Sequence, residues 1–120
     1  MLKPIPRSIL AHAVALKIAT GTDEWQNPTY RTVTVSNVYL EQNLAFRKTT
    51  ENTERTRRAT LFVDARLSTP VLNWDLLADQ SERAGAPMVV ECGTRVYTVD
   101  GVETLYDDSG NVHHYEVGLV

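Results

Sequence analysis

The fold is decided by the C-terminal part of the chain, MVVECGTRVYTVDGVETLYDDSGNVHHYEVGLV, which spans residues 88–120. Valine and tyrosine recur in this stretch, and two groups of turn-forming residues interrupt it, at 93–94 (GT) and 107–111 (DDSGN). β-Branched and aromatic residues favour strands, whereas Asp, Asn and Gly favour the tight turns between strands. We therefore expect three strands here, at 88–92, 95–106 and 112–120, with a break or bulge in the second strand near Gly101.

Two segments N-terminal to this part of the chain are also rich in β-branched residues and predict strands, at residues 59–65 (ATLFVDA) and 30–40 (YRTVTVSNVYL). Residues 10–18 place apolar side chains at every second position, which favours a further strand, although their alanines leave a helix open. A turn-rich link is expected at 20–28, a break at 68–70 and a short helix at 73–79. The sequence thus predicts an all-β fold, a small barrel or sandwich of about six strands with one short helix.

The segment at 42–58 differs from the rest of the chain because it is polar throughout its second half. Between Phe46 and Ala59 it contains no apolar residue. Such a segment buries too little surface to offset the entropy of ordering it, so we expect a long mobile loop that serves a function. A simple solvated loop is the alternative. The loop residues singled out for assembly or for lining a channel are Phe46, Arg47, Lys48, Arg55, Arg57 and Arg58.

The length of 120 residues suits one domain, expected over 1–120, and the net charge is −3. Residues 67–120 hold nine acidic and two basic side chains, so the charge is unevenly placed. This balance argues against a dedicated binder of duplex DNA, which normally carries a basic face. The single cysteine, Cys92, excludes an internal disulfide, and no signal peptide or membrane span is evident, so synthesis in the cytoplasm is expected.

Motifs for catalysis are largely missing from the sequence. Neither form of glycine-rich phosphate loop occurs, and Cys92 would need a histidine nearby to act as a nucleophile. His113 and His114 invite a metal site, but adjacent strand residues point to opposite faces, so we expect no shared ion. The run at 107–111 resembles a calcium loop in composition alone and is interpreted as a hairpin turn. No catalytic residue, metal site or cofactor is therefore predicted.

Both tryptophans, Trp25 and Trp74, lie in or beside loops and next to carboxylates. Two roles are open for them: plugs at the ends of a barrel, or anchors at an interface, where tryptophan is enriched. The basic residues of the 42–58 segment have no interleaved aromatic residues except Phe46, so they do not indicate a stacking platform for single strands.

Two stretches carry a resemblance to a known family. The opening residues 1–7 (MLKPIPR), followed by an apolar strand, and the closing residues 105–120 (LYDDSGNVHHYEVGLV) resemble the minor capsid proteins of tailed bacteriophages and prophages. Trp25 and Tyr30 around the first link, and residues 93–99 (GTRVYTV), also fit this group.

The resemblance implies a head-completion protein of a long-tailed phage: a head–tail connector or stopper subunit without catalytic residues. Such proteins form a ring, typically of twelve copies, between the portal or adaptor proteins above and the tail proteins below. The ring closes the DNA channel and offers a surface for the tail, so the expected location is the head–tail junction of the virion. The alternative is a small β-barrel module that binds nucleic acid or a host protein.

Overall fold

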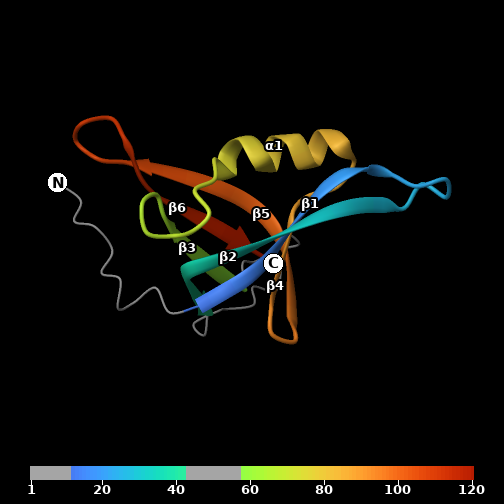
Figure 1. The fold of residues 1–120 in the computed structure, drawn as a ribbon, viewed down its shortest axis with the longest axis horizontal. Helices are drawn as coiled ribbons and strands as arrows, with labels where there is room; N and C mark the ends of the chain where they lie inside the picture. The colour runs from blue at the N-terminus through green and yellow to red at the C-terminus, as the bar shows by residue number, and fades with distance from the viewer. Residues whose placement is uncertain (1–11, 43–57) are drawn as a thin grey trace, which may run out of the picture.

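A computed structural model describes residues 12–42 and 58–120 of the chain. Figure 1 shows one helix lying over a strongly twisted antiparallel sheet. The elements are β1 (His12–Thr22), β2 (Pro28–Gln42), β3 (Ala59–Asp64), α1 (Trp74–Ala84), β4 (Val89–Cys92), β5 (Arg95–Tyr106) and β6 (Val112–Leu119). The expected strands and the expected helix are all present, and the described part of the segment expected at 10–18 is strand and not helix, because β1 begins at His12.

The sheet closes on itself as a barrel in the order β1-β2-β3-β6-β5-β4. Every neighbouring pair in the barrel is antiparallel. The barrel closes where β4 pairs with β1, over only three residue pairs, from Ala15↔Glu91 to Lys17↔Val89. The predicted all-β class is confirmed, and of the two architectures the molecule adopts the barrel.

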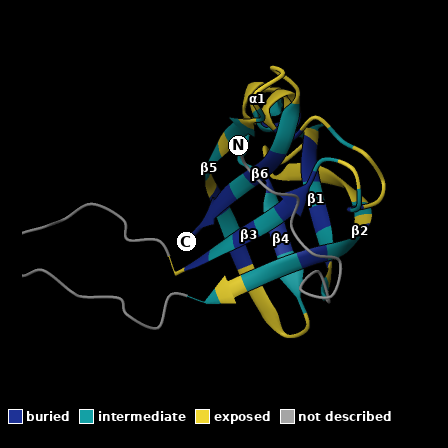
Figure 2. Ribbon diagram, turned by 90° about the vertical axis from the view of Figure 1, so that its left-hand side faces the viewer, coloured by how far each residue is buried: buried dark blue, intermediate teal, exposed yellow. Residues whose placement is uncertain are grey.

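The core follows from the period of two along each strand. Buried and less buried residues alternate along much of each strand, which Figure 2 shows by its colours, as expected where every second side chain faces the interior. Full burial of one such side chain is worth about 1.5–3 kcal/mol. The fully buried set from five of the strands is Leu16, Val35, Val38, Ala59, Leu61, Val90, Val117 and Leu119.

Helix α1 begins and ends at two clear capping residues. The Asn73 side chain accepts a hydrogen bond from the Leu76 N–H at 3.1 Å, and Gly85 ends the helix with φ 126°. Trp74, the first residue of α1, has no exposed surface and packs in the core cluster. Of the two roles left open for Trp74, the structure therefore gives the core position, which leaves no surface for an interface anchor.

Two hairpins extend beyond the barrel, at opposite ends of the long axis in Figure 1. One is formed by the ends of β5 and β6. The other, which we call the β1–β2 arm, comprises residues 18–32, where β1 has passed the last residue that pairs with β4. The expected link at 20–28 is thus shorter than predicted, because β1 continues to Thr22 and β2 begins at Pro28, which leaves residues 23–27 as the turn.

The base of the arm is braced by the helix. The Ser81 hydroxyl of α1 accepts a hydrogen bond from the Ala19 N–H at 2.9 Å and donates one to the Ala86 carbonyl at 2.8 Å. Ser81 has no exposed surface, so water cannot replace either bond. At the end of the helix, a Cβ placed on Gly85 would lie 3.6 Å from the Thr22 methyl group. The last turn of α1 therefore lies directly against β1 of the arm.

Substitution of Ser81 by alanine tests this brace. We expect Ser81→Ala to lower the free energy of unfolding by about 2 kcal/mol, because a buried N–H and a buried carbonyl both lose their partner. Denaturant unfolding followed by circular dichroism measures the change. Ser109→Ala, at an exposed position of the β5–β6 turn, is the matched control and should change stability by less than about 0.5 kcal/mol. Equal stabilities of the two variants would show that the brace contributes little.

Candidate functional site

The tip of the β1–β2 arm is a fixed turn at residues 23–27. The Asp23 carboxylate accepts hydrogen bonds from the Trp25 N–H at 2.8 Å and the Asn27 N–H at 2.9 Å. The Asp23 and Gln26 N–H groups close the turn on the Asn27 and Asp23 carbonyls, at 2.9 and 3.1 Å. Gln26 adopts φ 67°, the left-handed region that glycine favours. The residues on either side of Trp25 are therefore held by four hydrogen bonds.

The β5–β6 hairpin ends in a turn of the same type, at residues 107–111. Asp107 accepts hydrogen bonds from the Ser109 and Asn111 N–H groups at 2.8 and 3.0 Å. Its backbone N–H donates to Asn111, and the Gly110 N–H donates to Asp107. Gly110, with φ 84°, takes the left-handed position. The turn predicted at 107–111 is present, and the turn at 23–27 lies within the turn-rich link expected at 20–28. In the second turn Gln26 takes the left-handed position that Gly110 takes in the first.

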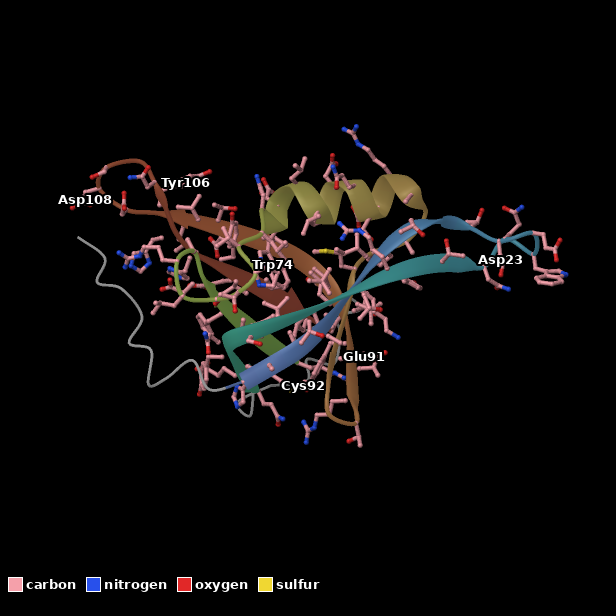
Figure 3. All side chains as sticks on the ribbon, viewed as in Figure 1. Asp23, Trp74, Glu91, Cys92, Tyr106 and Asp108 are labelled. Carbon is pink, nitrogen blue, oxygen red and sulfur yellow. The ribbon has the colours of Figure 1, made fainter. Side chains whose placement is uncertain are left out.

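Trp25 itself is 73% exposed, the largest value among the exposed large hydrophobic residues of the described chain. Figure 3 shows the arm reaching away from the barrel, with Asp23 labelled at its tip. Asp23 and Glu24 place two carboxylates beside the indole. An apolar side chain on a fixed acidic turn has the features of an interface anchor, the role that remains open for Trp25.

A second candidate surface lies at the β4–β5 hairpin. Arg58, Thr94, Arg95, Val96 and Tyr97 line an open pocket of about 510 Å³, which we call the Arg58 pocket. The Arg58 guanidinium lies 5.0 Å from the centre of the Tyr97 ring and donates to the Val96 carbonyl at 3.4 Å. Val96 is 56% exposed and offers an apolar wall. The pocket therefore combines two cations with the aliphatic surface of Val96, and the buried Tyr97 ring supports the Arg58 guanidinium from below.

Of the loop residues singled out from the sequence, Arg58 alone is described. Phe46, Arg47, Lys48, Arg55 and Arg57 lie outside the described residues, so their assignment to an assembly or channel loop stays a prediction. The other members of the Arg58 pocket were missed. They come from β5 and the turn before it. Nothing in the sequence indicates that these residues, which are far along the chain, lie next to Arg58 at the start of β3.

Acidic side chains gather on α1, β5 and the turn that follows, and we call this surface the acidic face. α1 packs against β5, and Glu82 of α1 and Asp100 of β5 line the same small pocket, so carboxylates far apart in the sequence lie close together there. Arg83 also lies on α1 and pairs with Asp79 at 3.1 Å. The members of the acidic face are Asp75, Asp79, Glu82, Asp100, Glu103, Asp107 and Asp108.

Tyr115 lies beneath this face. Burial raises the pKa of the Tyr115 hydroxyl, and the neighbouring Tyr106 and Asp75 raise it further, against the opposite effect of a hydrogen bond with the Trp74 backbone. Tyr115 therefore stays neutral at physiological pH and adds no charge to the acidic face.

The two histidines of β6 lie closer together than their sequence positions predict. His113 and His114 bring their Nδ1 atoms to 2.7 Å, and His114 Nε2 lies 3.0 Å from the Glu116 carboxylate. The expectation that they point to opposite faces is wrong, because the register shifts at this point: Tyr106 pairs with Val112 and Leu105 with His114, so His113 is bulged. Within residues 12–42 and 58–120, no three His, Cys, Asp or Glu side chains form a group able to hold a metal ion.

Cys92 is half-buried at the end of β4 and pairs with Arg95, whereas His114 pairs with Leu105 at the other end of β5. Ten residues of strand separate the two positions, about 30 Å along β5. The arrangement therefore does not form a Cys–His pair. No helix in the described part of the chain is long and apolar enough to cross a membrane.

Comparison with known proteins gives one match. The model of a family described as "Minor capsid protein" matches residues 6–119, nearly the whole chain. No curated protein and no solved structure matches. The match agrees with the resemblance carried by residues 1–7 and 105–120. The chain therefore belongs to the minor capsid protein family and is a structural component of a virion.

Proposed function

We propose that the protein is a head–tail connector subunit of a long-tailed phage, similar to the stopper proteins that complete the head. In this role several copies, twelve in the simplest case, form a ring below the portal and its adaptor proteins. The ring closes the DNA channel after packaging and offers its lower surface to the tail. The protein acts by assembly and not by catalysis.

The observation that carries the proposal is the family match over residues 6–119, because it assigns the chain to the virion. The fold adds support. A closed barrel leaves few free sheet edges, so a subunit of this kind does not aggregate through its strands. The β1–β2 arm extends beyond the barrel and can provide a contact outside the barrel wall. A barrel with a projecting arm is suited to a ring in which each copy contacts its neighbours.

The acidic face indicates which side of each subunit faces the DNA in the ring. Negative charge repels the phosphate backbone, so DNA that passes such a surface does not bind to it. The acidic face is formed by α1 and β5, two packed elements whose relative position is fixed. We therefore place α1 and β5 toward the lumen of the ring, in contact with the packaged DNA. The portal and tail proteins then contact the two ends of the barrel.

Native mass spectrometry and cryo-electron microscopy of particles test the proposal together. We expect a monomer when the purified protein is free and a ring of density at the head–tail junction of intact particles, because assembly requires the portal. A stable monomer that is missing from particles would contradict the proposal. Tight, salt-dependent binding of short DNA by that monomer would support a nucleic-acid module instead.

The orientation of the acidic face is tested by reversing two of its charges. In the double variant Glu82→Lys/Glu103→Lys, each copy gains two lysines on the face assigned to the lumen. We expect filled particles whose infectivity falls at least ~10-fold, since many lysines in one ring would hold the DNA phosphates. DNA release from purified particles, followed with an intercalating dye, should slow accordingly.

Glu41→Lys is the control for this variant. Glu41 is exposed on β2, on the opposite edge of β3 from β6, and does not belong to the acidic face. It should leave DNA release unchanged. Normal release from the Glu82→Lys/Glu103→Lys particles would place the acidic face away from the DNA.

A further inference from the structure

We propose that the arm tip of one copy docks in the Arg58 pocket of a second copy, with Trp25 as the anchor. The inference rests on the proposed ring and names the contact between its neighbouring subunits. Three features of the described residues carry it: the fixed turn around Trp25, the composition of the pocket, and the opposite charges of the two surfaces.

The arm presents Trp25 at low entropic cost. Four hydrogen bonds hold the backbone of the turn, and Ser81 braces the base of the arm against α1. A side chain on an already ordered segment loses little further freedom on binding. A tryptophan buries about 150–250 Å² when it is enclosed, and it is among the residues that contribute most to interfaces. The exposed fraction of 73% means that most of this area is still available.

The Arg58 pocket suits an indole. Its volume of about 510 Å³ leaves room for a ring of this size. Val96, 56% exposed, provides an apolar wall, whereas the Tyr97 ring is buried beneath the Arg58 guanidinium. The Arg58 guanidinium already lies over Tyr97. A guanidinium between two aromatic rings gains a second cation–π contact, which favours tryptophan over other residues.

Charge complementarity selects this pocket for the arm tip. Asp23 and Glu24 flank Trp25, and Arg58 and Arg95 flank the pocket. Asp23 has one carboxylate oxygen engaged in the turn, so Glu24 is the residue better placed to meet an arginine of the second copy. Such pairing fixes the orientation of an interface and disfavours contact with the acidic face.

The positions of the two surfaces explain why the contact leads to a ring. In Figure 1 the arm and the β4–β5 hairpin point in different directions, so the docking surface and its receptor are separate patches. A contact between two different patches is heterologous: each copy uses its arm on one neighbour and its pocket on the other. Such contacts form a closed ring when the rotation between copies divides a full turn evenly.

Cross-linking between introduced cysteines tests the contact. The starting variant is Cys92→Ser, which removes the native thiol. Glu24→Cys marks the arm tip and Thr94→Cys marks the pocket, and both positions are exposed. After treatment with a short thiol-to-thiol cross-linker, we expect the double-cysteine variant to give a ladder of dimers, trimers and larger species. A mixture of the two single-cysteine variants should give dimers alone, and neither single variant should cross-link by itself.

Glu24→Cys paired with Ser109→Cys, in the β5–β6 turn, is the matched control and should give no ladder. The reaction is run on purified particles and on the concentrated free protein. A ring at the junction without a ladder would overturn the arm contact and leave the connector function standing. Absence of the protein from the junction would overturn the connector function. In that case the presence or absence of a ladder from the concentrated free protein would show whether the arm docks in the pocket.

A second pair of variants measures how much Trp25 contributes to the contact. Trp25→Ala should reduce the yield of cross-linked species at least ~30-fold at limiting protein concentration, as expected for loss of a central interface residue. Tyr106→Ala, at a residue 58% exposed at the other end of the molecule, should leave the yield unchanged. Equal yields from the two variants would rule out Trp25 as the anchor, and circular dichroism confirms that both are folded.

Discussion

The short seam between β1 and β4 is the constraint on which the rest of the structure depends. Three residue pairs close the barrel, and the Lys17–Glu91 ion pair, at 2.8 Å, spans the same seam. Both side chains are about one-third exposed, so the ion pair adds at most about 1 kcal/mol and the backbone ladder carries the closure. Because the seam ends at Lys17, the rest of β1 is free to leave the barrel with β2. The projecting arm is thus a direct consequence of how little of β1 the closure uses.

Helix α1 stabilises the part of β1 that does not pair with β4. Beyond Lys17 the edge of β1 would expose unpaired backbone groups, and Ser81 supplies a partner for one of them at Ala19. The same helix inserts Trp74 into the core and carries part of the acidic face. One element therefore stabilises the barrel, fixes the direction of the arm and sets the charge of one side. In the proposed ring, the same helix would therefore contribute both to the surface facing the DNA and to the support of the arm that contacts a neighbouring copy.

The strands could be predicted from the sequence because their period of two and their β-branched residues are local signals. The errors have physical reasons. The helix was expected to end at 79, but it continues to Ala84, where the polar Ser81 faces inward and bonds with the Ala19 N–H of β1. The bulge at His113, and the meeting of Arg58 with Tyr97, depend on strand register, which one sequence does not specify. For the candidate site, the sequence identified Trp25 and Arg58 separately but gave no reason to relate them.

In the proposed ring, the exposed Trp25 on its braced arm becomes covered when copies assemble. Hydroxyl-radical footprinting read by mass spectrometry measures this coverage, because it follows both tryptophans as separate peptides even in whole particles. In the free protein we expect fast oxidation of Trp25 and slow oxidation of the buried Trp74. In particles, Trp25 should become as protected as Trp74. If Trp25 is oxidised equally fast in particles and in the free protein, the arm is not an interface between copies.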